Sequence, residues 1–304
     1  MVDHPQFAGI LYVISTPIGN LEDLSPRAAR TLGEVHVVAA EDTRSAAFLL
    51  RHAGVADASV VSFHEHNEIE RTRQLVTDLL EGRDVGLISE AGTPGISDPG
   101  FRLVRGARLR GIAVRSVPGP SAFLAALSVS GLPTDQFAFL GFPPRGNALR
   151  KWLEEHLAAG MTLVFYEGPS RVLDTLEAID EAAPERLASI SREITKIYED
   201  TRSGLARELA EHYRSHRDQL RGEFVISLAP PGYGLGGGDR AEETAVGHRI
   251  GDAGDPIKMR QIDLLIEAGI RPSEAVAIVA RGHQVPKSPL YRDYQGWRED
   301  RERK

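Results

Sequence analysis

Short apolar runs that alternate with stretches of helical period dominate residues 10–130, and they constrain the fold more than any other feature. Each run has the length and composition of a buried strand and is followed by a polar or Gly/Pro-rich turn. The runs are Ile10–Ile14, Val35–Ala40, Val60–Phe63, Val85–Ile88 and Ile112–Val117. Strands and helices that alternate in this way predict an α/β fold with a mostly parallel sheet, covered on both faces by helices.

A second series of strands and helices follows Gly131-Leu132-Pro133. We expect its strands at Phe137–Leu140, Thr162–Phe165, Leu187–Ile190 and Glu223–Leu228, with helices at Ala148–Ala159, from Arg171 to Ala182, and at Gly204–Arg214. These elements predict a second, smaller α/β domain with a mixed sheet.

The remainder of the chain changes in character. Pro230–Asp255 is rich in Gly, Pro and charged residues, which is typical of a linker or a flexible flap. Pro256–Trp297 has the pattern of a small helical unit, and we expect the charged residues after it to be disordered. The predicted division is an N-terminal α/β domain (1–118), a second α/β domain (119–231), a Gly-rich linker (232–255) and a C-terminal helical region (256–304).

Composition excludes several classes of protein. The 304 residues include no cysteine, so disulfides, thiolate metal sites and cysteine nucleophiles are excluded. A net charge of −7 argues against a surface coated with basic residues, although a local basic cleft stays possible. No apolar run approaches the length of a membrane span, and Met1–Pro5 does not resemble a signal peptide. We therefore expect a cytoplasmic protein with no membrane segment.

The stretch Ser89–Gly100 is the most distinctive loop of the sequence. It follows the expected strand Val85–Ile88 and precedes a helix that starts near Phe101, with Asp98 as the expected helix cap. Its glycines let the backbone approach a ligand, and the N–H groups of a helix start favour polar or anionic groups. A stiff connection needs fewer residues, so the pattern favours a ligand-binding loop over a plain turn.

Polar residues gather just after the expected strands. They are Glu41-Asp42-Thr43-Arg44, His64-Glu65-His66, Glu90 and Ser121. Ligands bind at the carboxyl edge of an open parallel sheet, so these residues predict one cleft built from many strand ends. The alternative is that Glu41, Asp42 and Arg44 form a structural ion cluster.

Other patterns in the sequence give little support for a function. Gly232–Gly237 fits G-x-G-x-x-G, but no helix opens there, so it is not a dinucleotide fingerprint. His64 and His66 could share a face of a strand, yet no third ligand follows at a recognisable spacing, and we expect no metal site. No G-x-S-x-G elbow supports a serine hydrolase.

Several long motifs together resemble one family. They are Ser15–Leu21, Ala40–Arg44, Phe63–Glu68, Ile88–Gly100, Val117–Ala122, Phe165–Arg171 and Arg192–Lys196. In this order and spacing they resemble the ribosomal RNA small-subunit methyltransferase I family of the tetrapyrrole methylase superfamily, over about residues 10–230. The tail around Lys287–Tyr291 resembles the family's C-terminal helical region less specifically.

The resemblance implies two α/β domains of tetrapyrrole-methylase type, with S-adenosylmethionine in the cleft between them, and a homodimer. It also implies 2′-O-methylation of cytidine 1402, in the decoding centre of 16S rRNA. The positions that match the family's cofactor loops are Pro17, Ile18, Gly19, Gly92, Thr93, Pro94, Ile96, Ser121, Ala122, Tyr166, Glu167 and Ala229.

The implied reaction needs positioning and the removal of one proton, because a ribose hydroxyl must attack the sulfonium methyl in line. The candidate bases are Asp42, Glu41, Glu90 and His64, with water as the alternative, and Arg44 could orient a phosphate or carboxylate. Basic residues of the tail, such as Arg271 and Lys287, suggest contacts with RNA phosphates. Two alternatives stay open: a small-molecule methylase for corrinoid or porphyrin precursors, and a catalytically silent RNA-binding assembly factor.

Overall fold

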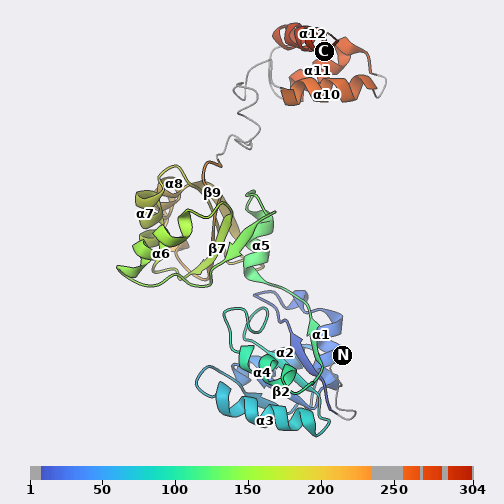
Figure 1. Cartoon of the computed structure of the whole chain (residues 1–304), viewed down its shortest axis with the longest axis vertical. Helices are drawn as coiled ribbons and strands as arrows, with labels where there is room; N and C mark the ends of the chain where they lie inside the picture. Colours follow the sequence, from blue (N-terminus) through green and yellow to red (C-terminus); the bar gives the residue numbers. More distant parts are fainter. Residues whose placement is uncertain (1–7, 234–255, 268–269, 283–286, 303–304) are drawn as a thin grey trace. The chain divides into compact units, whose positions relative to one another are not determined.

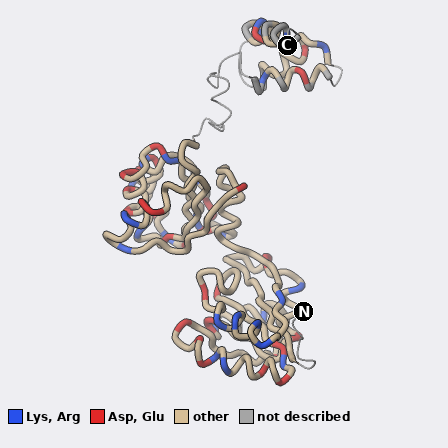
Figure 2. The backbone as a smooth tube through the Cα atoms, in the orientation of Figure 1, with Lys and Arg blue, Asp and Glu red and all other residues tan. Residues whose placement is uncertain are grey.

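The computed structural model describes residues 8–233, 256–267, 270–282 and 287–302. The chain divides into two compact units, Met1–Gly232 and Tyr233–Lys304. Figure 1 shows the elements of each unit, and Figure 2 shows Lys and Arg interspersed with Asp and Glu along the chain.

The first sheet of the larger unit is entirely parallel, as the sequence predicted. Its strands are β1 (Leu11–Ile14), β2 (Val37–Ala40), β3 (Val60–Ser62), β4 (Val85–Ile88) and β5 (Val114–Val117), in the order β3-β2-β4-β1-β5. β2 and β4 are buried along their whole length, because helices cover both faces of the sheet. Every strand of a parallel sheet ends at the same edge, so the segments that follow these strands meet there.

The helices around this sheet pack through apolar stripes. One face packs against α1 (Pro26–Glu34) and α2 (Thr43–His52), and the other against α3 (Glu68–Leu80) and α4 (Phe101–Arg108). A short 3₁₀ helix, Leu21–Asp23, follows the loop after β1. Neighbouring residues of one strand enter opposite clusters, as Val37 and Val38 do, because successive side chains of a strand point to opposite faces.

The second sheet is mixed. It comprises β6 (Phe137–Phe139), β7 (Thr162–Glu167), β8 (Leu187–Arg192), β9 (Asp200–Leu205) and β10 (Phe224–Leu228), in the order β6-β7-β10-β8-β9. β6 pairs parallel with β7, whereas β10 runs antiparallel to β7 and β8, and β8 antiparallel to β9.

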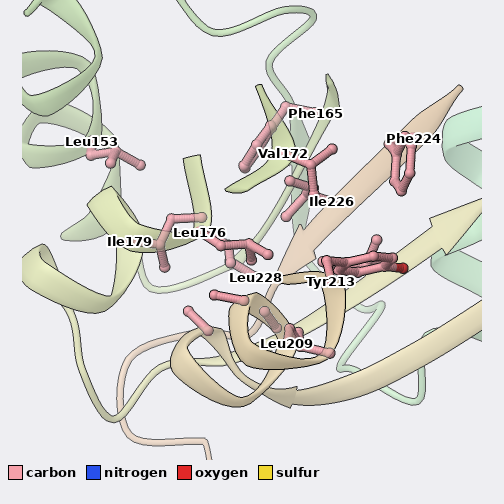
Figure 3. Packing of buried hydrophobic residues seen from close by; sticks show 14 of the residues in the cluster. Leu153, Phe165, Val172, Leu176, Ile179, Leu209, Tyr213, Phe224, Ile226 and Leu228 are labelled. Atoms are coloured by element: carbon pink, nitrogen blue, oxygen red, sulfur yellow. The ribbon is translucent and has the colours of Figure 1, made fainter. Parts of the chain in front are cut away.

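The two faces of the second sheet are covered differently. α6 (Ala148–Leu157), α7 (Val172–Ala182) and α8 (Ala206–Ser215) lie on one face, and α5 (Ala122–Val129) lies on the other (Figure 1). A second 3₁₀ helix, Arg217–Gln219, follows α8. Figure 3 shows the core of the first face, where Phe165, Ile226 and Tyr213 converge.

One strand of this sheet was not predicted from the sequence, whose pattern indicated a helix from Gly204 and no strand before it. β9 has the sequence DTRSGL, without apolar alternation, and lies at the sheet edge. It is held by pairing with β8 and by its hydroxyls: Thr201 donates to Ser191 Oγ at 2.9 Å, and Ser203 donates to the Ser130 carbonyl at 3.1 Å. Tertiary pairing decides the conformation of such a polar segment.

The smaller unit is helical, as expected. It contains α10 (Pro256–Glu267), α11 (Pro272–Gly282) and α12 (Lys287–Glu302), around a core that includes Met259, Val276 and Leu290. The expectation of a disordered end was wrong, because α12 continues through the charged residues to Glu302. The predicted linker falls mostly at 234–255, outside the described residues. Within the described residues, none of the helices has the length and apolar character needed to cross a membrane.

Candidate functional site

A pocket of about 330 Å³ lies in the larger unit, at the carboxyl edge of the first sheet. Segments that follow β1, β2, β4 and β5 contribute to its wall, together with the end of β7 and the start of β10. The lining residues are Ile18, Glu41, Glu90, Ala91, Gly92, Thr93, Ile96, Ser97, Asp98, Ser121, Ala122, Phe142, Tyr166, Glu167, Gly168, Pro169, Gly222, Glu223, Phe224 and Val225.

Many residues that the sequence singled out meet in this pocket. They are Ile18, Glu41, Glu90, Gly92, Thr93, Ile96, Ser121, Ala122, Tyr166 and Glu167. The parallel sheet explains the convergence, because residues after neighbouring strands are far apart in the chain and adjacent at the sheet edge.

The Gly92 loop is tied to two neighbouring loops. Thr16 and Gly92 form an isolated bridge in which each N–H donates to the other's carbonyl, at 2.8 and 3.2 Å. The Thr93 hydroxyl hydrogen-bonds with Ser15 Oγ at 2.8 Å and donates to the Pro120 carbonyl at 3.3 Å. The backbone of Gly92 has φ +87°, and a Cβ there would lie 3.4 Å from Ile18 Cγ2. Glycine is therefore required by backbone conformation and also lies close to the neighbouring wall.

Five carboxylates line the pocket. Glu167 and Glu223 are paired with Arg171 and Lys196, so the net acidity comes from the other three, Glu41, Glu90 and Asp98. The pKa of Asp98 is raised to about 6, chiefly by burial and then by the negative charges of Glu41 and Glu90, while a hydrogen bond with Ser89 opposes the shift. Burial also raises the pKa of Tyr166. A pocket with this charge favours a ligand that carries positive charge.

Asp98 was predicted as the cap of α4, and that prediction was wrong. The helix starts at Phe101, and the carboxylate of Glu68 on α3 accepts from the N–H groups of Gly100 at 3.1 Å and Arg102 at 3.4 Å. Asp98 lines the pocket instead. The signal that could have identified it is its place in the same loop as Glu90, after a parallel strand.

Glu167 lines the pocket, but both of its carboxylate oxygens already accept hydrogen bonds from other groups of the protein. Its Oε1 accepts from Gly168 N at 2.8 Å and Arg171 Nε at 2.7 Å, and its Oε2 accepts from Arg171 Nη2 at 2.8 Å and Thr175 Oγ1 at 2.7 Å. Arg171 also donates to the Pro143 carbonyl at 2.9 Å. The geometry therefore favours a role for Glu167 in shaping the wall next to Phe142.

Asp42 and Arg44 do not line the pocket. Asp42 is the N-cap of α2: its Oδ1 accepts from Arg44 N at 2.7 Å and Ser45 N at 3.1 Å, and its Oδ2 lies 3.3 Å from Arg44 Nη2. These hydrogen bonds lower the pKa of Asp42, and the bond from Ser45 N has the largest effect. The arrangement favours the structural alternative for Asp42 and Arg44, whereas Glu41 faces the pocket.

His64 also lies outside the pocket lining. Its Nε2 is 3.2 Å from Asn67 Nδ2, and its ring centroid is 6.0 Å from that of His66. Within the described part of the chain, no group of three or more His, Cys, Asp or Glu side chains could hold a metal ion.

Four predicted cofactor residues are absent from the pocket lining: Pro17, Gly19, Pro94 and Ala229. Gly19 faces the side chain of Lys196. Ala229 follows the distal end of β10, because β10 runs antiparallel to β7 and pairs Phe224 with Glu167 at the pocket. The wall at Gly222–Val225 was missed, since the sequence does not reveal strand direction in a mixed sheet.

Comparison with known proteins places the chain in a family. Residues 10–210 match the family described as tetrapyrrole (corrin/porphyrin) methylases. The ribosomal RNA small subunit methyltransferase I of Halalkalibacterium halodurans is 42% identical over 287 residues, which cover 94% of each chain. The protein of that name from Pseudomonas aeruginosa is 43% identical over 286 residues, 93% of this chain and 96% of that protein.

Solved structures support the fold. Diphthine synthase has a TM-score of 0.58 at 15% identity, covering 72% of this chain and 89% of its own. Uroporphyrin-III C-methyltransferase from Thermus thermophilus, complexed with S-adenyl homocysteine, has a TM-score of 0.50 at 21% identity and covers 73% and 97%. By its sequence relatives and its fold, the chain belongs to the ribosomal RNA small subunit methyltransferase I family of the tetrapyrrole methylases.

Proposed function

We propose that this protein transfers the methyl group of S-adenosylmethionine to the 2′-hydroxyl of a decoding-centre cytidine in 16S rRNA. The names of its relatives support methylation of small-subunit RNA. The observation that carries the cofactor proposal is the acidic pocket, whose lining combines the carboxylates of Glu41, Glu90 and Asp98 with small residues such as Gly92, Ser121 and Ala122.

The pocket residues fit S-adenosylmethionine in size and charge. A volume of about 330 Å³ is within the range of small-molecule sites. Gly92 leaves room that a Cβ would take beside Ile18. The carboxylates suit the ammonium and sulfonium charges, and Asp98 is the residue that we assign to binding.

The N-terminus of α5 offers a complementary site for the carboxylate of the methionine moiety. Ser121 precedes this helix without a side-chain cap hydrogen bond, and Ser121 and Ala122 both line the pocket. The first N–H groups of a helix attract anions because they have no partner within the helix.

When bound, S-adenosylmethionine supplies an electrophilic methyl group and leaves as a neutral thioether. The new bond joins the ribose oxygen to the methyl carbon, the sulfur–methyl bond breaks, and the hydroxyl proton goes to a base. The candidate bases that line the pocket are Glu41 and Glu90, whereas Asp42 and His64 do not line it. The protein's main contribution is to hold the two reactants in line.

The proposal has three further parts, of which the homodimer rests on the family resemblance and the other two rest on the sequence pattern. They are a homodimeric assembly, a cytoplasmic location, and domain boundaries at residues 118 and 231. The cofactor and the pocket do not depend on them.

The decisive experiment incubates the protein with S-adenosylmethionine labelled in the methyl group and with small ribosomal subunits, followed by mapping of 2′-O-methylation. Label at the ribose of one cytidine is expected. Label on a base would contradict the proposed acceptor. Calorimetric titration with S-adenosylmethionine tests the alternative of a catalytically silent RNA-binding factor. Absence of cofactor binding would exclude both the RNA methyltransferase and the small-molecule methylase.

The family match also names corrin and porphyrin methylases, so a tetrapyrrole precursor belongs in the same assay as a competing substrate. Transfer to that precursor, with none to RNA, would favour the small-molecule alternative.

A further inference from the structure

The loop between β8 and β9 exposes two adjacent large side chains. We call residues Glu193–Glu199 the rim loop. Within it, Ile197 is 94% exposed and Tyr198 is 72% exposed. Apolar side chains that are exposed singly need no explanation. Ile197 and Tyr198 are adjacent and both largely exposed, which makes this loop a candidate interaction surface.

The base of the rim loop is firmly held. Lys196 Nζ donates to Glu193 Oε1 at 2.9 Å and to Glu223 Oε2 at 3.1 Å. The N–H of Thr195 donates to Glu199 Oε2 at 2.6 Å. Glu193 and Thr195 have φ of +50° and +68°, a conformation that non-glycine residues rarely adopt. Strained residues persist where surrounding contacts fix them, so the loop presents Ile197 and Tyr198 in a defined position.

The rim loop lies beside the pocket wall. Glu223, which lines the pocket, is the ion-pair partner of Lys196. Gly222 also lines the pocket, and a Cβ on it would collide with the Glu193 side chain. A Cβ on Gly19 would lie 2.6 Å from Lys196 Cγ, and Gly19 follows the lining residue Ile18. Lys196 therefore contacts segments next to two parts of the pocket wall.

The position and chemistry of the rim loop select its partner. An RNA chain is far larger than a pocket of about 330 Å³, so nucleotides on either side of a methylated one must lie on the surface around the pocket. Proteins recognise unpaired RNA bases by stacking them on aromatic side chains. The cation of the rim loop is already paired with two carboxylates, which favours stacking over phosphate binding there.

We propose that the rim loop binds the substrate RNA, with Tyr198 stacking on an unpaired base next to the target nucleotide and Ile197 packing beside it. This proposal rests on the proposed function, because it takes the pocket as the methylation site.

The test compares Tyr198→Ala and Tyr198→Phe with wild type, and uses Leu109→Ala as a matched control. Leu109 is 73% exposed and follows α4, outside the pocket lining. For each variant we would measure the affinity for small ribosomal subunits at several salt concentrations, the affinity for S-adenosylmethionine, and the mass by sedimentation velocity.

We expect Tyr198→Ala to weaken binding of the subunit about tenfold, a loss in the range of one base-stacking contact. The salt dependence should keep its wild-type slope, because no phosphate contact is removed. S-adenosylmethionine affinity and mass should not change. Tyr198→Phe and Leu109→Ala should bind the subunit as wild type does.

Two results would overturn the proposal. Unchanged affinity of Tyr198→Ala for the subunit would exclude a role in binding RNA. A lower mass of Tyr198→Ala would show that the rim loop contacts a second copy of the chain. Failure of the proposed function is distinguishable, because wild type would then transfer no methyl group to the subunit.

Discussion

The carboxylate of Glu68 on α3 caps α4 by accepting from the backbone N–H of Gly100, 32 residues further along the chain. It also pairs with Arg102 Nε at 3.1 Å. The Glu68 side chain is 13% exposed, so these bonds are shielded from water. A residue of one helix thus fixes the start of the next, directly after the loop that lines the pocket.

Replacing Glu68 should therefore destabilise the fold. We expect Glu68→Ala to lower the free energy of unfolding by about 1 kcal/mol, the typical cost of a lost helix cap. Urea denaturation measures it. Arg102→Ala is the control, because an exposed ion pair contributes less. Equal losses in the two variants would contradict the capping role.

Gly92→Val should impair the proposed cofactor site while leaving the overall fold intact. Gly92 has φ +87°, which a β-branched residue resists, and its Cβ would press on Ile18. We expect weaker S-adenosylmethionine binding by calorimetry, with a circular dichroism spectrum close to that of wild type. A folded variant with unchanged affinity would remove the loop from the site.

Asp98→Asn should bind S-adenosylmethionine more weakly, because it removes a negative charge from the pocket. In the wild type, affinity should rise as pH increases through about 6, the pKa of Asp98. Calorimetry at pH 5 and pH 7.5 tests both expectations. A variant that binds as tightly as wild type at the higher pH would exclude Asp98 from binding.

The same substitution should raise stability at neutral pH. The pKa of Asp98 increases from 3.8 to about 6 in the folded protein, so the folded state binds more protons between these values. The contribution of Asp98 to the free energy of unfolding is therefore highest at low pH, where its carboxyl is protonated in both states, and it falls as pH rises through 6. Asp98→Asn should melt above wild type at pH 7.5, and the difference should shrink as pH falls towards 4.

Asp42→Asn tests whether the N-cap of α2 also takes part in the reaction. Asparagine is an equally good cap, so the helix should persist. Because Asp42 does not line the pocket, we expect a methylation rate near that of wild type at saturating cofactor. A fall of about 10²-fold, typical of a lost general base, would restore Asp42 as a candidate.

Removing residues 240–304 should leave S-adenosylmethionine binding intact and weaken binding of the ribosomal substrate. The exposed cations Arg271, Lys287 and Arg292 would supply phosphate contacts, whereas Lys258 is only 2% exposed. Loss of these contacts should reduce the salt dependence of binding. A truncated protein with the wild-type salt slope would assign the tail to packing or assembly.

The parallel sheet and much of the pocket were predictable from the sequence. The spacing of apolar residues and the ends of strands are local properties of a sequence. The apolar residues of β2 and β4 are enough to predict these strands, and the strands are followed by Glu41, Glu90 and Gly92. Asp98 and Glu68 were not predictable in their roles, since the choice of cap for α4 depends on how α3 packs beside it. The position of Ala229 outside the pocket lining was not predictable, because the direction of β10 is set by its partner strands.

The reciprocal bridge between Thr16 and Gly92 has a consequence for hydrogen exchange. Both amides are bonded within the protein itself. They should exchange slowly in the free protein, and S-adenosylmethionine should add little protection to them. The conformational entropy of this loop is thus lost during folding, and ligand binding does not have to order it again.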